Sequence, residues 1–360
     1  MATLSVLTGN CPGMIERRHF NQFGPRHNRV EINLMRYWWV NQNATYRHEV
    51  PGGYLWSPKI KKNGHANPFY DFMREIAPGD IVFSFSDTLI KAVGIVASHC
   101  YEAPQPSEFG AVGINWNDIG WRVDVKFHEL EGQIKPSDFM DRIAPFLPRK
   151  YSPLRQNGYG LQAVYLTLVN DRLAETLIDL IGREARTLVS GVRIQDPRAM
   201  PTAIGLAEWE EHEINEISQD KTIPETTRMA VVLARRGQGL FKQNVMRLEA
   251  RCRITGVDQM EHLRASHCKP WRDCSNEERL NGENGLLLTP NADHLFDRGF
   301  ISFENNGKLL ISPVAHQGSL HKMGIDVSGG LNVGAFSSGQ SKFLDFHRES
   351  VFLESRYISR

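Results

Sequence analysis

Two neighbouring stretches decide the fold of the C-terminal third: Leu263-Arg-Ala-Ser-His-Cys-Lys-Pro-Trp271 and Asn284-Gly-Leu-Leu-Leu-Thr-Pro-Asn-Ala-Asp-His-Leu-Phe-Asp-Arg-Gly-Phe-Ile-Ser-Phe303. The first is a short hydrophobic β segment that ends at His267. The second opens with an asparagine and a β segment, and continues as a helix that carries Asp293 and Asp297. These two aspartates are about one helical turn apart, so both carboxylates face the same way. The pattern predicts two strands followed by a helix, with a histidine and two carboxylates available for chemistry.

These residue types suit metal-assisted hydrolysis of a phosphodiester. The carboxylates of Asp293 and Asp297 could hold one divalent cation, because hard cations prefer oxygen ligands. His267, at the end of the first strand, could take a proton from a water that attacks phosphorus beside that cation. The expected cofactor is therefore Mg²⁺ or Mn²⁺.

The motifs Ala-Ser-His-x-Lys-Pro-Trp, Asn-Gly-Leu-Leu-Leu and Asp-x-Leu-Phe-Asp-x-Gly resemble the HNH family of ββα-metal endonucleases. The resemblance implies that His267 is the general base and that Asn284 fixes the loop and orients that base. It also implies Asp293 as a metal ligand, with Asp297 one turn later. Many family members carry a His or Asp directly before the catalytic histidine, whereas this chain has Ser266, a weaker ligand.

Charge is segregated along the chain although the formal net charge is only +1. Residues 184–225 carry 4 Lys+Arg and 9 Asp+Glu, whereas residues 226–250 carry 5 Lys+Arg and 1 Glu. An acidic linker thus masks a basic helical segment directly before the nuclease motifs, where a phosphate backbone would pass. The side chains expected to contact the DNA backbone are Arg235, Arg236, Lys242 and Lys269.

The cysteines and the hydropathy indicate the cellular compartment in which the protein is expected. Five cysteines at irregular positions do not form a disulfide framework, which suits a reducing compartment. Cys252, Cys268 and Cys274 lack a CxxC pair, so a structural zinc site is not expected. No stretch approaches the roughly 20 apolar residues of a membrane span, and no signal peptide is apparent. We expect a cytoplasmic protein with no membrane partner.

The region before the acidic linker has an α/β character. Residues 1–34 show no sustained periodicity and are interpreted as a mobile leader. Helices are predicted to start at Asn67-Pro68 and to cover 171–181. The predicted strands cover 37–40, 81–85, 92–97, 121–127 and 163–169. We expect an α+β fold, with a curved mixed sheet or partly open barrel over 35–183.

Within 35–183, the Tyr-Trp-Trp strand, the Leu-Trp segment, the Pro-Gly-Asp turn and the Gly-Ile strand resemble an EVE domain of the PUA superfamily. The resemblance implies nucleic-acid binding and an aromatic pocket for an extruded, often modified, base. Stacking and hydrogen bonds in such a pocket offset the few kcal/mol that extrusion costs. The residues predicted to form it are Asn41, Gln42, Trp56, Ser84, Phe85, Tyr151 and Gln156.

Together these patterns predict an EVE-like reader at 35–183, a helical linker at 184–250, an HNH core at 251–316 and a C-terminal extension at 317–360 that packs on it. The resemblance implies a modification-dependent endonuclease, directed against double-stranded DNA that contains 5-methylcytosine or 5-hydroxymethylcytosine. Two alternatives stay open: an HNH nuclease whose first domain reads RNA or unmodified DNA, and a non-catalytic reader of modified nucleic acid. One HNH site cuts one strand, so a homodimer is one route to a double-strand break.

Overall fold

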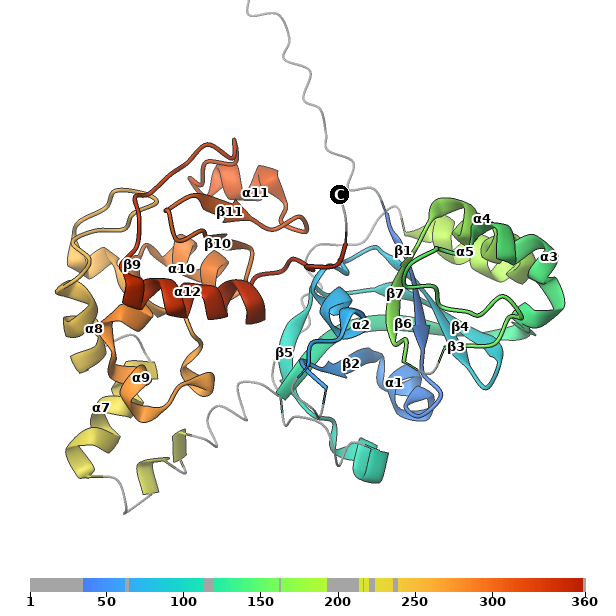
Figure 1. Ribbon diagram of the computed structural model, residues 1–360, viewed down its shortest axis with the longest axis horizontal. Helices are drawn as coiled ribbons and strands as arrows, with labels where there is room; N and C mark the ends of the chain where they lie inside the picture. Colours follow the sequence, from blue (N-terminus) through green and yellow to red (C-terminus); the bar gives the residue numbers. More distant parts are fainter. Residues whose placement is uncertain are drawn as a thin grey trace, which may run out of the picture. The chain divides into compact units, whose positions relative to one another are not determined.

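The computed structural model describes residues 35–61, 65–112, 119–161, 163–192, 214–215, 217–219, 224–235 and 239–358 (Figure 1). The predicted leader over 1–34 and much of the acidic segment over 184–225 lie outside these residues. In the part of the chain that is described, no helix is long and apolar enough to cross a membrane.

The N-terminal part is built on a mixed seven-stranded sheet. Its strands are β1 (Tyr37–Asn41), β2 (Tyr54–Pro58), β3 (Ile81–Ser86), β4 (Leu89–Val96), β5 (Tyr101–Pro104), β6 (Ile119–Ile134) and β7 (Leu166–Val169). The strand order is β2-β6-β4-β3-β1-β7, and β5 also pairs with β6. Only the β1–β3 pair is parallel among the pairs that the structure describes.

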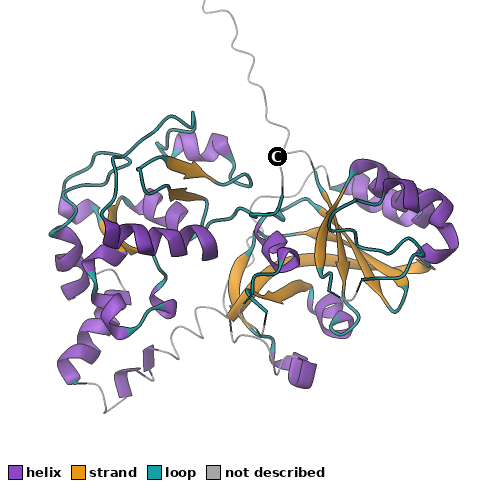
Figure 2. Ribbon diagram, in the orientation of Figure 1, coloured by secondary structure: helices purple, strands orange, loops and turns teal. Residues whose placement is uncertain are grey.

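Strand β6 makes this sheet curl into a half-barrel (Figure 2). It is 16 residues long, and its first part pairs with β2 and β5 whereas its second part pairs with β4. The register shifts between Ile90 and Ala92 of β4, and a bulge of this kind bends a strand and increases its twist. The α+β class and the strongly curved sheet expected from the sequence are therefore confirmed.

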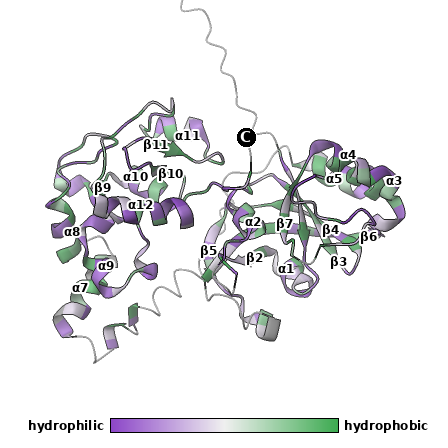
Figure 3. Cartoon of the chain, viewed as in Figure 1, coloured by the Kyte–Doolittle hydropathy of each residue, from purple (hydrophilic) through white to green (hydrophobic). Residues whose placement is uncertain are grey.

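Five α-helices accompany the sheet among the described residues: α1 (Tyr46–Gly52), α2 (Pro68–Asp71), α3 (Met140–Ile143), α4 (Asp171–Ile181) and α5 (Arg183–Gly191). Helix α4 has the predicted bounds, and the side chain of Asn170 caps it by accepting from the backbone N–H of Leu173. Its Leu173 and Leu177 are buried while its other face is polar, which gives the mixed green and purple of α4 in Figure 3.

Helix α1 and strand β2 were not expected from the sequence. Pro51 lies inside α1, and the pair Gly52-Gly53 follows it, so this segment has the composition of a turn. Strand β2 is buried at every position and therefore lacks the alternation that marks a half-exposed strand.

The C-terminal part contains α7 (Glu225–Arg235), α8 (Gly239–Met246), β8 (Arg264–His267), α9 (Asn276–Leu280), β9 (Gly285–Leu288), α10 (Pro290–Asp297), β10 (Ile301–Phe303), β11 (Leu309–Ile311), α11 (Gln317–Lys322) and α12 (Ser338–Ser350). The expected order of two strands and a helix is confirmed by β8, β9 and α10. Helix α12 belongs to the predicted extension, and its His347 ring stacks on the Phe296 ring of α10. This contact ties the extension to the ββα unit.

Candidate active site

The site is built on the antiparallel pair of β8 and β9, in which His267 lies opposite Gly285. Side chains alternate along a strand, so neighbouring residues of β8 face opposite ways. Ser266 accordingly lies on the side of Asp293 of α10, where it lowers the pKa of that carboxyl, whereas the His267 ring lies against Phe241 of α8. Strand β8 thus supplies Ser266 to the side of the site that carries Asp293, and supplies His267 to the side that carries Phe241.

Two contacts that orient the His267 ring are described by the structure. It is parallel to the Phe241 ring, with centroids 3.7 Å apart and an interplanar angle of 5°. Its Nε2 lies 3.0 Å from the backbone oxygen of Arg279. A carbonyl oxygen can only accept, so Nε2 carries the proton and the basic lone pair of the neutral ring lies on Nδ1. This tautomer is suited to proton abstraction by Nδ1.

Arg279 is a site residue that the sequence did not reveal. Its Nε donates to the backbone oxygen of Trp271 at 3.0 Å, and its guanidinium lies 3.9 Å from the centroid of the Trp271 ring. Trp271 in turn donates from its indole nitrogen to the Val231 carbonyl. The Arg279 carbonyl, which accepts the hydrogen bond from His267 Nε2, is therefore held in place by contacts of the Arg279 side chain. Every residue has a backbone carbonyl, so no sequence motif predicts this acceptor.

Asn284 is fully buried and spans the loop that follows His267. Its Oδ1 accepts from the backbone N–H of Lys269 at 2.8 Å, and its Nδ2 lies 3.2 Å from the Glu278 carbonyl. Its backbone oxygen accepts from the N–H of Cys268 at 2.9 Å. Asn284 thus ties the strand end to the next helix, as a loop-fixing residue must.

The two predicted carboxylate ligands lie on α10. Asp293 pairs with Arg264, whose Nη1 is 3.2 Å from its Oδ2. Burial raises the pKa of Asp293, the bonds from Ser266 and Arg264 oppose this, and the charge of Asp297 raises it further. Ser266 and Asp297 thus both lie near enough to Asp293 to influence its pKa.

The donor set fits a hard divalent cation. Among the described residues, no three His, Cys, Asp or Glu side chains are grouped so as to hold a metal by themselves. Asp293 and Asp297 offer carboxylate oxygens, and Ser266 offers a hydroxyl. Mg²⁺ suits such a site, because it usually keeps several waters and binds one or two carboxylates together with substrate phosphate.

The predicted backbone-contacting cations have other partners where their side chains are described. The Lys242 ammonium donates to the carbonyls of Met260 and Leu263, at 3.0 and 2.8 Å. Lys269 pairs with Glu278 at 2.6 Å. Arg235 ends α7, but its side chain lies outside the described part, as does all of Arg236.

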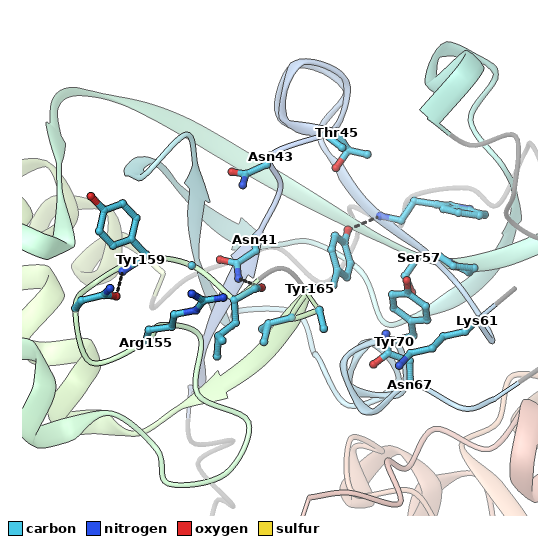
Figure 4. A pocket seen from close by; sticks show the side chains of 18 residues that line it. Asn41, Asn43, Thr45, Ser57, Lys61, Asn67, Tyr70, Arg155, Tyr159 and Tyr165 are labelled. Atoms are coloured by element: carbon cyan, nitrogen blue, oxygen red, sulfur yellow. Dashed lines mark hydrogen bonds between the residues drawn. The ribbon is translucent and has the colours of Figure 1, made fainter. Parts of the chain in front are cut away.

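The N-terminal part contains a pocket of about 920 Å³ (Figure 4). Its lining includes three residues of β2, an end strand of the sheet, together with Asn41 at the end of β1 and the segment just before β7. The residues that line it are Asn41, Asn43, Ala44, Thr45, Trp56, Ser57, Pro58, Lys61, Asn67, Tyr70, Arg155, Asn157, Tyr159, Gly160, Leu161, Ala163, Val164 and Tyr165. None of these described lining residues is acidic, and Lys61 and Arg155 are basic. Aromatic rings, amides and cations therefore surround this space.

The structure places two of the predicted base-pocket residues, Asn41 and Trp56, in the lining. The other five lie elsewhere. Gln42 and Ser84 are buried and bonded to each other, and Phe85 belongs to the core. Tyr151 packs beside Phe72 and Tyr357, and Gln156 is exposed. Sequence reasoning missed Tyr70, Tyr159 and Tyr165, which come from a helix, a loop and the segment just before β7.

Comparisons with known proteins agree with the C-terminal geometry. Residues 252–304 match the HNH endonuclease family. No curated protein matches the chain. The NMR structure of Rpa0253 from Rhodopseudomonas palustris is similar at 13% identity over 46% of this chain and 100% of that chain, with a TM-score of 0.27, too low to support an argument. The C-terminal part of the protein therefore contains an HNH endonuclease domain, at residues 252–304, which points to a metal-dependent nuclease that acts on nucleic acid.

Proposed function

We propose that the protein is a modification-dependent DNA endonuclease, in which the N-terminal pocket receives an extruded modified cytosine and the HNH domain cuts the strand. The observation that carries the proposal is that one chain combines an HNH site with a separate pocket lined by aromatic, amide and basic side chains. The sequence resemblance of 35–183 to an EVE domain of the PUA superfamily supports the same reading. We expect the protein to act in the cytoplasm and to cut foreign DNA that carries the modification.

In the proposed reaction, His267 is the general base. Its Nδ1 takes a proton from a water that attacks phosphorus, while the Arg279 carbonyl and the Phe241 ring hold the imidazole. The P–O3′ bond breaks, and the leaving oxygen takes a proton from solvent, which gives 5′-phosphate and 3′-hydroxyl ends. A divalent cation held by Asp293 and Asp297 would stabilise negative charge on the phosphate and the leaving oxygen. Asn284 positions the loop and does not touch the reacting atoms.

The pocket has the chemistry that a nucleotide requires. Tyr70, Tyr159 and Tyr165 offer rings on which a base can stack, which is worth about 1–3 kcal/mol per base. Lys61 and Arg155 offer positive charge for a flanking phosphate, and no acidic side chain among the described lining residues opposes it. In Figure 4, Arg155 and Tyr159 lie to one side of Tyr165, and Tyr70 and Lys61 to the other.

The proposal is tested by incubating the full-length protein with matched plasmids that contain cytosine, 5-methylcytosine or 5-hydroxymethylcytosine, with Mg²⁺ or Mn²⁺. We expect cleavage of modified plasmids only. Equal cutting of all three would contradict modification dependence, and would favour a nuclease whose first domain reads unmodified DNA. Absence of cutting with every metal would contradict the nuclease assignment.

A matched variant separates catalysis from binding. His267→Ala should abolish cleavage and leave affinity for modified DNA unchanged, because the pocket lies in the other part of the chain. If the wild-type protein binds modified DNA but His267→Ala changes no rate, the protein is a reader without a nuclease function. Agarose gels also separate nicked from linear plasmid, and linear product that rises with protein concentration would support a homodimer.

A further inference from the structure

The hydroxyl of Ser57 is an unusual polar group in the N-terminal pocket. Ser57 is 1% exposed and lines the pocket, and its Oγ has no hydrogen-bond partner among the residues that the structure describes (Figure 4). A buried hydroxyl normally has a partner, because leaving it unpaired costs about 1–3 kcal/mol. An unpaired polar group that persists in a pocket wall is therefore a candidate for a bond to a ligand.

A second buried group, the Glu49 carboxylate, holds several residues near Ser57 in place. Its carboxylate is fully buried and accepts four bonds: from the Gln42 amide, the Thr45 hydroxyl, the Trp56 backbone N–H and the Tyr165 hydroxyl, at 2.7, 2.6, 2.8 and 2.5 Å. Thr45, Trp56 and Tyr165 all line the pocket. Burial raises the pKa of Tyr165 well above its ordinary value, so this hydroxyl keeps its proton. The wall is thus formed by groups that are already paired.

The contrast between these groups is informative. The polar groups that bond to the Glu49 carboxylate have partners inside the protein. The Oγ of Ser57, the next residue after Trp56 on β2, has none within the described part of the chain. On the opposite side of β2, Gly120 of β6 lies so close that a Cβ there would be 2.3 Å from the Ser57 carbonyl oxygen. Strands β2 and β6 are therefore closely packed at Ser57.

From these observations we propose that Ser57 is a specificity-determining residue of the pocket, and that its hydroxyl bonds to the polar edge of the bound base. This inference rests on the proposed function, since it assumes that the occupant is an extruded base. A hydroxyl both donates and accepts, so it matches an exocyclic amino group, a ring carbonyl or a hydroxymethyl substituent. The hydrogen-bonded residues of the lining would hold the ring of the base, and the Ser57 hydroxyl would bond to the polar groups on the edge of that ring.

The test combines stability and binding in Ser57→Ala. No bond is lost in the free protein, so its melting temperature should be unchanged or slightly higher. Affinity for a duplex with one modified cytosine, measured by fluorescence anisotropy with the full-length protein in EDTA, should fall about fivefold to tenfold. Stability kept and affinity lost together are the signature of a ligand-contacting hydroxyl.

Ser98→Ala is the matched control. Ser98 is also buried, but its Oγ accepts from the Asp124 backbone N–H at 2.9 Å and does not line the pocket. This variant should lose roughly 2 °C in melting temperature and keep its affinity. Equal affinity of Ser57→Ala and wild type for every duplex would overturn the inference.

The probes also locate the contact and separate the two proposals. A loss confined to the 5-hydroxymethylcytosine duplex supports the inference with the bond at the substituent, and a loss shared with 5-methylcytosine supports it with the bond at the ring edge. If wild-type protein binds modified and plain duplexes equally, the proposed function fails before Ser57 is tested. If wild type discriminates and Ser57→Ala discriminates equally well at full affinity, only the inference about Ser57 fails.

Discussion

The rings of Phe241 and His267 lie face to face, 3.7 Å apart at an angle of 5°. Phe241 belongs to α8, which precedes the HNH motif along the chain, so the proposed base is oriented by a residue from a different element. Phe241 is fully buried and therefore cannot turn away without repacking of the core. The orientation of the His267 ring therefore depends on the position of α8.

Phe241→Leu should slow cleavage and preserve the fold. The change removes the flat surface under the imidazole and costs roughly 1 kcal/mol of stability. A displaced base reacts more slowly, so we expect a fall in kcat of about tenfold to a hundredfold with little change in KM. Single-turnover cleavage of modified DNA measures this, with Met246→Ala, an exposed change on the same helix, as control. An unaltered rate in a folded Phe241→Leu variant would show that stacking does not position His267.

Gly285→Ala should destabilise the C-terminal part. A Cβ at this position would lie 2.4 Å from Cγ2 of Val245 and 2.8 Å from Cζ of Phe241. Overpacking of this kind costs typically about 1–3 kcal/mol, and here it pushes α8 away from β9. The control is Gly330→Ala, where the nearest atom is 3.6 Å away. Thermal unfolding compares the Gly285→Ala and Gly330→Ala variants. Equal melting temperatures would mean that α8 can shift without loss of stability.

Arg264→Gln should strengthen cation binding. Arg264 is well exposed, and its guanidinium occupies a carboxylate oxygen of Asp293 that a cation would share. Removing this competitor should lower the Kd for Mn²⁺ about twofold to fivefold, since exposed ion pairs are worth about 0.2–1 kcal/mol. Isothermal titration calorimetry without DNA measures the affinity, and Arg251→Gln, an exposed change outside the site, is the control. Weaker binding in Arg264→Gln would contradict competition at Asp293.

Acid should destabilise the protein through His347. Burial lowers the pKa of His347 to about 3, and the ring donates from Nε2 to the Phe296 carbonyl while Nδ1 accepts from Ser302. A depressed folded-state pKa gives stability that is present above the ordinary value of about 6.5 and is lost as pH falls toward 3. The loss from this group is up to roughly 1.4 kcal/mol per pH unit in that range.

The measurement for His347 is the dependence of melting temperature on pH between 7 and 4. His347→Gln should be less stable at pH 7 and should lose less stability on acidification than the wild type. The exposed His262→Gln should follow the wild-type curve. Parallel curves for His347→Gln and wild type would show that other groups account for the acid sensitivity.

The sequence predicted those parts of the fold whose cause is local. Asn170 and the apolar spacing of α4 lie within a few residues of one another, and β8, β9 and α10 follow a contiguous motif. Helix α1 was missed because Pro51 has the character of a turn residue, and tertiary packing overrides that preference.

In the candidate site, too, the sequence predicted only those features that have a local cause. His267, Asn284 and Asp293 carry side-chain chemistry at a characteristic spacing, whereas Arg279 contributes a backbone carbonyl that any residue could supply. The pocket joins residues more than a hundred positions apart, such as Asn41 and Tyr165, so no local pattern could gather them. Paired and unpaired buried hydroxyls cannot be told apart without coordinates.

The alternation along β8 sets a limit on how this strand can vary in length. Ser266 faces Asp293, and His267, its immediate neighbour, faces Phe241. Inserting or deleting a single residue upstream in β8 would still leave a hairpin, but its side chains would exchange faces. A change of length in β8 should therefore disrupt the site, and homologous sequences should align through 264–267 without gaps.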